Sequence, residues 1–332
     1  MSIQTQNLSV GAVVIGRNEG QRLVRCLESL VGTANVAYVD SGSTDGSVKA
    51  AQALGASVVE LDMQQPFTAA RARNAGFGCL LEKYPDIEFV QFVDGDCEVV
   101  DGWIENAGAF LQHNPDYAVV CGRRRERYPE ASLFNQLCDI EWDTPIGDAL
   151  ACGGDALIRV SAIREVGGYR DAMIAGEEPE MCFRLRHAGW KIFRLDAEMT
   201  RHDAAMTHLS QWWKRNKRAG HAYAESFDLH HSTAEKFRLR EVLSILFWAA
   251  GLPIAILLMT VVVSAYFLLL LAIYPVQAFR LFMTYREQLS KPRQAMIYAL
   301  SNVFGKFAQL SGVMSFYVKK RLKRQSHIIE YK

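Results

Sequence analysis

The sequence predicts an α/β fold in which a largely parallel sheet carries helices on both faces, followed by a helical membrane segment. Three observations support this prediction. Short apolar strands alternate with amphipathic helices over residues 9–125, polar and acidic residues follow several strand ends, and residues 242–279 contain no charged side chain. The chain has 332 residues, of which 50% are hydrophobic, so a sizeable core is available for one large or two ordinary domains.

The alternating elements can be assigned in order along the N-terminal part. Short apolar runs predict strands at residues 10–15, 36–39, 57–61 and 89–93. Apolar residues at helical spacing predict helices at residues 21–30, 46–54 and 69–81. Sheets of this kind bind ligands at the carboxyl ends of their strands, near the point where the strand order reverses.

Polar residues gather where those strands end. Arg17 and Glu19 follow the first strand, Asp40 the second, and Asp94 and Asp96 the fourth. Hard cations such as Mg²⁺ and Mn²⁺ prefer carboxylate and phosphate oxygens and take one or two protein carboxylates. The last two acids therefore predict a divalent-cation site with a diphosphate partner, although Asp-Gly is also ordinary turn chemistry.

The pattern is less regular between residues 121 and 210, where a glycine-rich stretch occupies residues 151–156. An acidic cluster then opens an amphipathic helix with Glu177, Glu178 and Glu180 in its first turn. Negative side chains stabilise the positive end of a helix dipole. On the residues alone, a structural and a catalytic interpretation of this cluster are equally favoured.

Charge and cysteine content restrict the class of protein and its compartment. A net charge of +1 argues against broad nucleic-acid binding, but eleven Lys or Arg stand against two Glu from residue 280 onward. The seven cysteines lack zinc spacing and are expected to be core residues in a reducing compartment. The polar N-terminus lacks the pattern of a secretory signal, so the N-terminal domain is expected in the cytoplasm.

The uncharged segment at about residues 242–279 predicts membrane attachment. A helical span needs about 20 residues, and at least about 17, so the segment holds one span or two short ones. Both flanks are basic, with Lys236, Arg238 and Arg240 before the segment and Arg280 directly after it. Because basic residues favour the cytoplasmic side, we expect a hairpin or a re-entrant pair that enters and leaves the membrane by the same face.

The last apolar stretch, at about residues 294–322, predicts an amphipathic helix. Lys306 interrupts its apolar face, and a basic cluster follows at residues 319–324. An interfacial helix on anionic lipid fits this pattern better than a third span does, and a solvated basic tail is the alternative.

Four motifs, taken together, resemble the family 2 glycosyltransferases. They are Val13-Val-Ile-Gly-Arg-Asn-Glu19, Val39-Asp-Ser-Gly-Ser-Thr-Asp-Gly46, Ala70-Arg-Ala-Arg-Asn-Ala-Gly76 and Asp94-Gly-Asp96. The resemblance covers roughly residues 9–220. It implies a GT-A fold, which is the Rossmann-like architecture of nucleotide-diphospho-sugar transferases. It also implies a nucleotide-sugar donor, a Mg²⁺ or Mn²⁺ cofactor and sugar transfer with inversion at the anomeric carbon.

The resemblance assigns donor-binding roles to residues of this chain. Asp40 matches the acid that accepts a hydrogen bond from the nucleotide base, and a carboxylate suits the imide N–H of uracil. A turn or capping aspartate is the alternative. Arg73 matches an arginine that contacts the base or a phosphate, with Arg71 as the nearby alternative. The wall of the same pocket is matched by Ile15, Arg17 and Glu19.

The same resemblance places metal ligands. Asp94 is expected to face the ribose or the metal, and Asp96 to bind the metal directly. His202 follows a strand predicted at residues 191–199, where related enzymes often place a histidine that completes the metal shell; a structural histidine is the alternative. The metal would bridge the two phosphates and neutralise the departing nucleoside diphosphate.

The resemblance also identifies a catalytic base. Inversion by single displacement requires a group that takes the acceptor's proton as its oxygen attacks. The family's base is the second acid of a Glu-Asp pair at a helix start, which here is Glu177-Glu178, so Glu178 inherits the role with Glu in place of Asp. Glu177 stays an alternative base, whereas Glu180 lies on a different helical face.

A segment at residues 211–215 resembles the Q-x-x-R-W element of processive polysaccharide synthases, but the order of Trp and Arg is wrong. The difference favours transfer of one sugar at a time. Trp212 and Trp213 are candidate acceptor-stacking residues or part of an interfacial aromatic belt. Arg215 or Arg218 is a candidate contact for the diphosphate.

The sequence therefore predicts a membrane-anchored, inverting and non-processive glycosyltransferase. It would move a sugar from a nucleotide-diphosphate donor, with UDP favoured, to a lipid-linked or cell-surface glycan acceptor. The catalytic domain is expected on the cytoplasmic face of the inner membrane. Its expected bounds are 1–235, with a nucleotide-binding half to residue 125 and an acceptor half from 126, followed by a membrane-associated region at 236–332.

Two rival functions are considered. A sugar-nucleotide pyrophosphorylase shares the sheet architecture but needs a long glycine-rich phosphate loop, and residues 16–20 are too short and too acidic for one. A non-catalytic membrane subunit that binds a nucleotide sugar or scaffolds a polysaccharide synthase is the alternative from another class.

Overall fold

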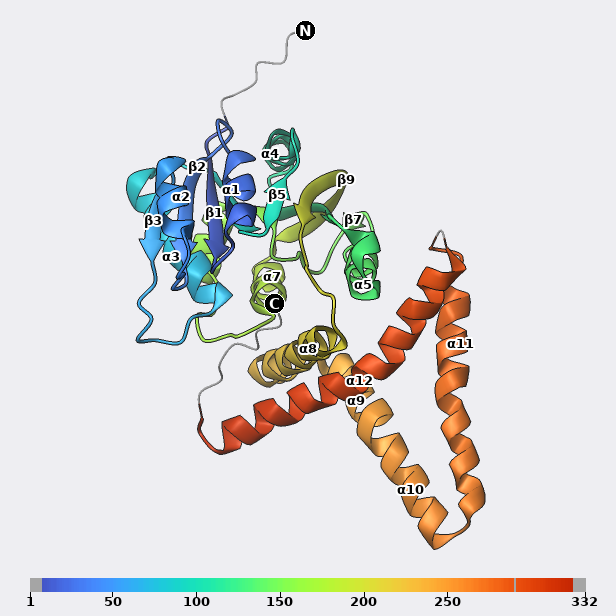
Figure 1. The fold of residues 1–332 in the computed structure, drawn as a ribbon. Helices are drawn as coiled ribbons and strands as arrows, with labels where there is room; N and C mark the ends of the chain where they lie inside the picture. The colour runs from blue at the N-terminus through green and yellow to red at the C-terminus, as the bar shows by residue number, and fades with distance from the viewer. Residues whose placement is uncertain (1–7, 290, 325–332) are drawn as a thin grey trace. The chain divides into compact units, whose positions relative to one another are not determined.

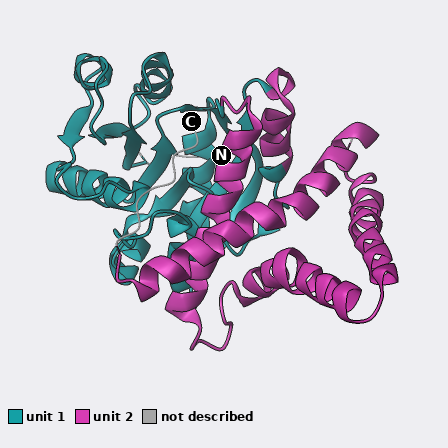
Figure 2. Cartoon of the chain, turned by 60° about the horizontal axis from the view of Figure 1, so that its bottom comes forward, with its two compact units in different colours: residues 1–128, 141–204 teal, residues 129–140, 205–332 magenta. Residues whose placement is uncertain are grey.

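The structure is a computed structural model that describes residues 8–289 and 291–324. These residues divide into two compact units (Figure 2). The first unit comprises the described residues up to 128 together with residues 141–204. The second comprises residues 129–140 and the described residues from 205 onward. The predicted domain boundaries stay a prediction.

A nine-stranded mixed sheet forms the centre of the first unit (Figure 1). Its strands are β1 (Val10–Gly16), β2 (Asn35–Asp40), β3 (Ser57–Glu60), β4 (Phe89–Asp94), β5 (Cys97–Val99), β6 (Tyr117–Glu126), β7 (Gly147–Asp148), β8 (Ala156–Arg159) and β9 (Lys191–His202). Their order is β3-β2-β1-β4-β8-β6-β9-β5, with β7 paired to β9. The first four are parallel, whereas β8 runs antiparallel to both β4 and β6.

Helices flank this sheet between the strands. They are α1 (Gln21–Glu28), α2 (Ser47–Ala53), α3 (Ala69–Lys83), α4 (Trp103–His113), α6 (Val160–Val166) and α7 (Glu177–His187). The core side of α1 consists of Leu23, Cys26 and Leu27, which recur at helical spacing and are buried. The predicted α/β fold is confirmed, and the four predicted N-terminal strands agree with the observed ones within one residue at each end. All cysteines are free, and all except Cys79 are buried.

Helix α3 packs unusually close to the sheet. A Cβ added to Gly76 would lie 2.5 Å from a methyl carbon of Val13 and 2.9 Å from one of Val39, so only glycine allows this approach. Thr68 begins the helix by accepting a hydrogen bond from the backbone N–H of Arg71. The close packing brings the first turns of α3 to the carboxyl ends of the parallel strands.

The second unit is helical. Its elements are η1 (Pro129–Ala131), α5 (Leu133–Glu141), α8 (Leu209–His230), α9 (Leu239–Leu246), the π-helical turn η2 (Phe247–Gly251), α10 (Leu252–Val262), η3 (Ala265–Ala272), α11 (Ile273–Tyr285) and α12 (Pro292–Arg321). Helices α8 and α12 cross with their backbones in contact. A Cβ added to Gly220 would lie 2.0 Å from the carbonyl oxygen of Gln309, and one added to Gly312 would lie 2.0 Å from that of Lys217. Small residues at a helix crossing permit such an approach.

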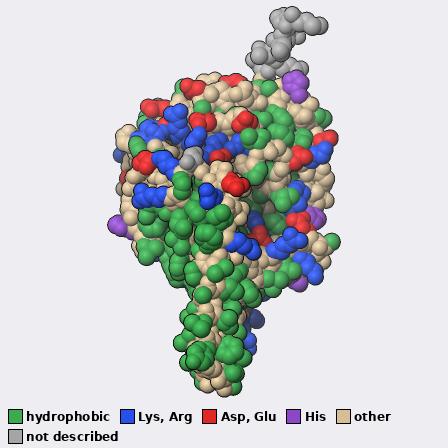
Figure 3. All heavy atoms as spheres, turned by 90° about the vertical axis from the view of Figure 1, so that its right-hand side faces the viewer, with side chains coloured by type: hydrophobic (Ala, Val, Ile, Leu, Met, Phe, Trp, Pro, Cys, Tyr) green, Lys and Arg blue, Asp and Glu red, His purple; other side chains and the backbone are tan. Residues whose placement is uncertain are grey.

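The predicted apolar hairpin appears as two consecutive helical segments. Leu239–Val262 and Ala265–Tyr285 are both long and apolar enough to cross a membrane, and residues 263–264 connect them. Their side chains are largely exposed, with Tyr266 at 80% and Val261 at 77%. Figure 3 shows hydrophobic side chains covering this hairpin. These segments are candidate membrane spans.

Candidate active site

A cluster of three acids around one arginine lies at the carboxyl end of β4. Arg73 extends from α3 and is almost fully buried. Its Nη1 lies 2.7 Å from Oε1 of Glu177, and its Nη2 lies 2.9 Å from Oδ1 of Asp94 and 3.2 Å from Oε1 of Glu178. The structure thus brings together predicted donor-binding and catalytic residues from three distant segments.

The two glutamates of this cluster differ in their environment. The side chain of Glu177 is 2% exposed and that of Glu178 is 15% exposed. Burial, followed by repulsion from Glu177, raises the pKa of Glu178 to about 7, although Arg73 acts in the opposite direction. A carboxyl group that titrates near neutral pH is suited to accept a proton as a general base. The arrangement therefore favours Glu178 over Glu177 for that role.

Glu180 has a different set of partners. Its buried carboxylate accepts hydrogen bonds from Arg170 at 2.6 Å and from Arg184 at 2.8 Å. Burial alone would raise the pKa of Glu180, but the hydrogen bond from Arg184 and the two positive charges lower it. This glutamate forms an ion pair that fixes the start of α7 and lies apart from the arginine cluster.

The second acid of the strand tip faces a histidine. Because β5 pairs antiparallel with β9 and Cys97 lies opposite His202, the preceding Asp96 comes next to the imidazole. Oδ1 of Asp96 lies 3.4 Å from Nε2 of His202, and both side chains are buried. The ligand atoms of Asp96, Cys97 and His202 lie within 4.8 Å of one another. Carboxylate and imidazole donors in this arrangement fit a divalent cation such as Mn²⁺.

Asp155 organises this edge of the sheet and was not among the predicted site residues. Its Oδ1 accepts a hydrogen bond from the backbone N–H of Asp94 at 3.1 Å and lies 2.7 Å from Arg124, while Oδ2 accepts one from Thr200 at 2.6 Å. The neighbouring Gly154 has no room for a side chain, since an added Cβ would lie 2.9 Å from Asp94 Oδ2. The glycine-rich stretch was the available signal for both residues.

Arg124 and Trp142 were also missed. Arg124 Nη2 lies 3.5 Å from Oδ2 of Asp94, and its guanidinium carbon lies 5.5 Å from the centre of the Trp142 ring. The same ring meets the imidazole of His202 edge-on, at 4.7 Å between centroids. Trp142 therefore contacts both the arginine beside Asp94 and the histidine beside Asp96. Trp142 lies in an irregular segment, where sequence periodicity gives no indication of its partners.

Asp40 is buried at the last position of β2 and faces the turn that follows. Its Oδ2 accepts hydrogen bonds from the backbone N–H groups of Gly42 at 3.0 Å and Ser43 at 2.7 Å, and its Oδ1 accepts one from the hydroxyl of Tyr38 at 2.8 Å. The backbone N–H of Asn18 donates to the Ser43 hydroxyl and links this turn to the loop after β1. These contacts match the turn role considered for Asp40, and its base-binding role stays a prediction.

The other predicted donor-binding residues lie at the end of β1. Ile15 is 9% exposed, whereas Arg17 is exposed and lies 4.9 Å over the ring of Phe67. Glu19 pairs with Arg22 at 2.7 Å. The structure thus gathers these residues at the same end of the sheet as Asp40.

Arg71, the alternative to Arg73, holds a loop instead. Its guanidinium donates to the backbone carbonyls of Asp62 at 2.7 Å, Gln65 at 3.1 Å and Pro66 at 3.3 Å. Arg73, and not Arg71, therefore belongs to the acidic cluster.

The candidate acceptor residues lie on α8 in the second unit. Trp212 is buried, and its indole N–H donates to the hydroxyl of Ser301 on α12 at 3.1 Å. Trp213 is 42% exposed, and Arg215 is half-buried. Trp212 thus packs between helices, and the acceptor roles of these residues stay predictions.

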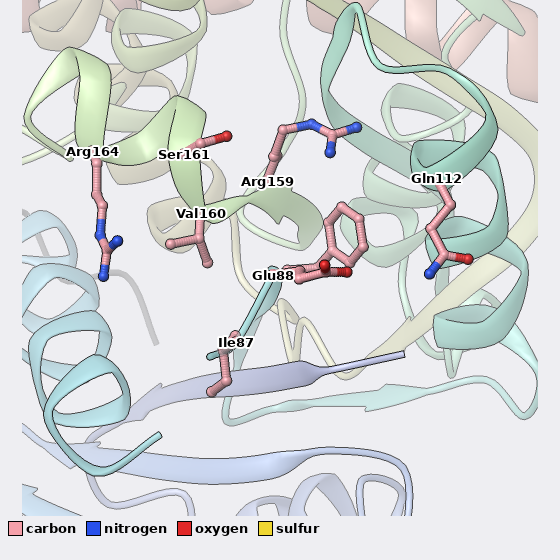
Figure 4. A pocket seen from close by; sticks show the side chains of 8 residues that line it. Ile87, Glu88, Gln112, Arg159, Val160, Ser161 and Arg164 are labelled. Carbon is pink, nitrogen blue, oxygen red and sulfur yellow. The ribbon is translucent and has the colours of Figure 1, made fainter. Parts of the chain in front are cut away.

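A cavity of about 450 Å³ lies at the other end of β4 (Figure 4). Arg159, one of its lining residues, pairs with Phe89 at the first position of β4, whereas the acidic cluster begins at Asp94, the last position. The guanidinium of Arg159 donates to the carbonyls of Leu111 and Tyr117. This cavity is therefore separate from the candidate active site.

Comparisons with known proteins identify similar sequences. Residues 12–166 match the sequence model described as glycosyl transferase family 2. Two curated proteins, both named pre-mycofactocin glycosyltransferase and from Mycobacterium tuberculosis strains CDC 1551 / Oshkosh and ATCC 25618 / H37Rv, are 29% identical over 226 residues. These alignments cover 62% of this chain and 45% of each relative, so the chain spans about half the length of the curated relatives it matches.

A solved structure extends the comparison to the fold. Mannosyltransferase PcManGT from Pyrobaculum calidifontis, in complex with GDP-Man and Mn²⁺, superposes with a TM-score of 0.58 at 18% sequence identity. The match covers 90% of this chain and 88% of that one. The predicted GT-A fold is thereby confirmed.

Proposed function

The chain belongs to family 2 of the glycosyltransferases, and from this premise we propose that it transfers a sugar from a nucleotide-diphosphate donor to an acceptor hydroxyl with inversion. The observation that carries the proposal is the position of Glu178. Its carboxyl group, with a pKa of about 7, lies in one ion-pair cluster with Arg73 and Asp94 at the carboxyl end of β4.

In the proposed reaction, Glu178 takes the proton from the acceptor hydroxyl while that oxygen attacks the anomeric carbon, and the nucleoside diphosphate leaves from the opposite face. Arg73 favours the ionised form of Glu178, because its guanidinium lies 3.2 Å from the carboxylate. Glu177 accepts a hydrogen bond from Nη1 of the same guanidinium and thereby orients it. The residues of the chain thus supply a base and a means of holding it.

We propose that Asp96 and His202 hold a divalent cation, with Asp94 contributing to the same site or contacting the ribose. When bound, such a cation neutralises the negative charge that develops on the departing diphosphate. The GT-A protein with the similar fold binds Mn²⁺ and GDP-Man, which supports a metal and a nucleotide sugar as the class of ligand. Among nucleotides we favour UDP, with Asp40 as the acceptor of its imide N–H.

The acceptor is proposed to be a lipid-linked or cell-surface glycan precursor, modified by one sugar at a time at the inner membrane. Support comes from the two candidate spans, whose flanks are both basic and so favour a cytoplasmic catalytic domain. A catalytic domain held at the bilayer meets lipid-borne acceptors at high effective concentration.

Helix α12 supports the same location. One side carries exposed apolar residues at spacings of four and ten: Met296, Leu300, Phe304, Met314 and Val318. The basic residues 319–321 then end the helix. An apolar stripe with a basic end favours a helix that lies in the interface of an anionic membrane.

The proposal is tested by separating donor binding from transfer. The full chain in detergent would be screened with UDP-sugars and GDP-sugars, with and without Mn²⁺, for turnover and for binding by calorimetry. Glu178→Gln should bind the donor as the wild type does and lose transfer by a factor of about 10² or more. Glu105→Gln, at an exposed position on α4, is the matched control and should be unaffected.

Two results would contradict the proposal. Transfer by Glu178→Gln at the wild-type rate would remove Glu178 from the role of base. Donor binding by the wild type without turnover of any donor would instead favour the non-catalytic membrane subunit.

A further inference from the structure

We infer that Glu126 is a positioning residue that fixes the orientation and the tautomer of His202, and so presents the His202 Nε2 atom to a divalent cation shared with Asp96. The inference rests on the proposed function, because it takes the metal site as its premise. It concerns a carboxylate on β6 to which neither a sequence motif nor a comparison assigns a role.

The imidazole of His202 lies between two carboxylates. On one side Nε2 is 3.4 Å from Oδ1 of Asp96, and on the other side Nδ1 is 3.8 Å from Oε2 of Glu126. All three side chains are buried, with exposed fractions of 7% or less. The two nitrogens of the ring therefore face different carboxylates, and only Asp96 belongs to the strand tip.

Chemistry assigns different tasks to the two sides. A neutral imidazole carries one N–H and one unprotonated nitrogen, and a metal binds the unprotonated one. A cation shared with Asp96 requires Nε2 to be free of a proton, so the ring proton is then on Nδ1, where the negative charge of Glu126 at 3.8 Å stabilises it. Carboxylates that accept the second N–H of a metal-binding histidine also raise its basicity as a ligand.

The backbone holds Glu126 in the position that this role requires. Its Oε1 accepts a hydrogen bond from the N–H of Tyr128 at 3.0 Å, and its Oε2 accepts one from the N–H of Ala204 at 3.0 Å. Glu126 is also the register partner of His202 in the parallel pair of β6 and β9. The N–H of Arg127 donates to the carbonyl of His202 at 2.8 Å, so the two strand ends are tied together.

A third side chain restricts the plane of the ring. The indole of Trp142 meets the imidazole at an interplanar angle of 71° and a centroid distance of 4.7 Å. With a carboxylate at each nitrogen and an aromatic ring against the imidazole, His202 is oriented before any cation binds. Such preorganisation raises metal affinity, because the ring need not be ordered during binding.

The test measures Mn²⁺ binding to the full chain in detergent without donor, by calorimetry and by pulsed electron paramagnetic resonance. The modulation from a ligating ¹⁴N reports the His202–Mn²⁺ bond directly, and His202→Ala gives its baseline. Glu126→Ala should weaken Mn²⁺ binding about 10- to 100-fold and diminish the modulation. Glu126→Gln removes the negative charge beside Nδ1 but keeps the shape of the side chain, so it should lose less affinity than Glu126→Ala, but at least about threefold.

Glu198→Gln is the matched control, since Glu198 is an exposed glutamate on β9 that pairs with Arg125. It should bind Mn²⁺ as the wild type does. Thermal unfolding without metal identifies a variant that fails to fold. If Glu126→Ala fails to fold, the Mn²⁺ affinity of Glu126→Gln tests the role of Glu126. Wild-type Mn²⁺ affinity and modulation in a folded Glu126 variant would overturn the inference alone. A wild type that binds no Mn²⁺ would instead remove the metal site on which both proposals rest.

Discussion

The guanidinium of Arg73 lies 3.2 Å from the carboxylate of Glu178, yet the pKa of that carboxyl is raised to about 7. Burial and the neighbouring Glu177 outweigh the arginine, whose charge is shared among three acids. Since Arg73 also binds Asp94, any ligand that changes the charge at Asp94 changes the field at Glu178. In the proposed reaction Asp94 serves the donor and Glu178 the acceptor, so Arg73 would couple the two sides of the site electrostatically.

Removal of the positive charge at position 73 should shift the pH profile of the enzyme. The wild type should lose transfer as pH falls through about 7, because Glu178 becomes protonated. In Arg73→Gln the pKa of Glu178 should rise further, so the acidic limb of the profile should move to higher pH. The measurement is the transfer rate against pH at saturating donor. Arg73→Lys keeps the charge and should retain most of the wild-type limb; an unmoved limb in Arg73→Gln would refute the coupling.

Glu178→Gln should be more stable than the wild type at neutral and alkaline pH. The folded chain binds the Glu178 proton more tightly than the unfolded chain, because the pKa is raised from 4.5 to about 7. The destabilising effect of this carboxyl is therefore absent well below pH 4.5, grows as pH rises, and is complete above about pH 7. The variant should gain up to about 3 kcal/mol there and nothing near pH 4. Unfolding midpoints measured across this range check it, and parallel curves would contradict it.

A methyl group at position 154 should damage the site, whereas one at position 153 should not. The added Cβ of Gly154→Ala would lie 2.9 Å from both Arg73 Nη2 and Asp94 Oδ2, whereas that of Gly153→Ala meets nothing within 4 Å. We expect Gly154→Ala to lower transfer at least about tenfold and to cost about 1–3 kcal/mol of stability. Gly153→Ala should resemble the wild type in both rate and unfolding midpoint. Equal behaviour of the two variants would argue that Gly154 does not restrict the arginine cluster.

Reporter fusions should place the ends of the apolar hairpin on one side of the membrane. If Leu239–Val262 and Ala265–Tyr285 both cross, a reporter after Lys332 should lie in the cytoplasm and one inserted between Val263 and Ser264 should lie outside it. A reporter before Leu239 is the control for the starting side. An external signal after Lys332 would mean a single span, and a cytoplasmic signal at the connection would mean a re-entrant segment.

Features that depend on residues close together in the sequence could be predicted, whereas features that depend on contacts between distant residues could not. The strands and helices up to residue 94 follow from local apolar periodicity, as β1 and β4 illustrate. The different environments of Glu177 and Glu178 could not be predicted from the sequence. They depend on contacts with Arg73, which lies 104 residues before Glu177. Asp155 was missed for the same reason: its partners, Arg124 and Thr200, lie on other strands.

The residues around the candidate metal site illustrate the same limit. The family resemblance indicated Asp96 and His202, but the register between β5 and β9 that makes them neighbours is visible only in the folded sheet. Glu126 and Trp142 contact the same imidazole from β6 and from an irregular segment. A sequence motif identifies residues that touch ligands more readily than residues that hold those residues in place.

The crossing of α8 with α12 makes the apolar hairpin an insertion between two packed helices. The chain leaves α8, forms the hairpin, and returns to pack on α8 again through Gly220 and Gly312. A chain in which a short linker replaces residues 239–291 would therefore retain both partners of this crossing. Such a shortened chain would keep the exposed apolar stripe of α12, so membrane binding by the shortened and full chains would separate the contribution of α12 from that of the hairpin.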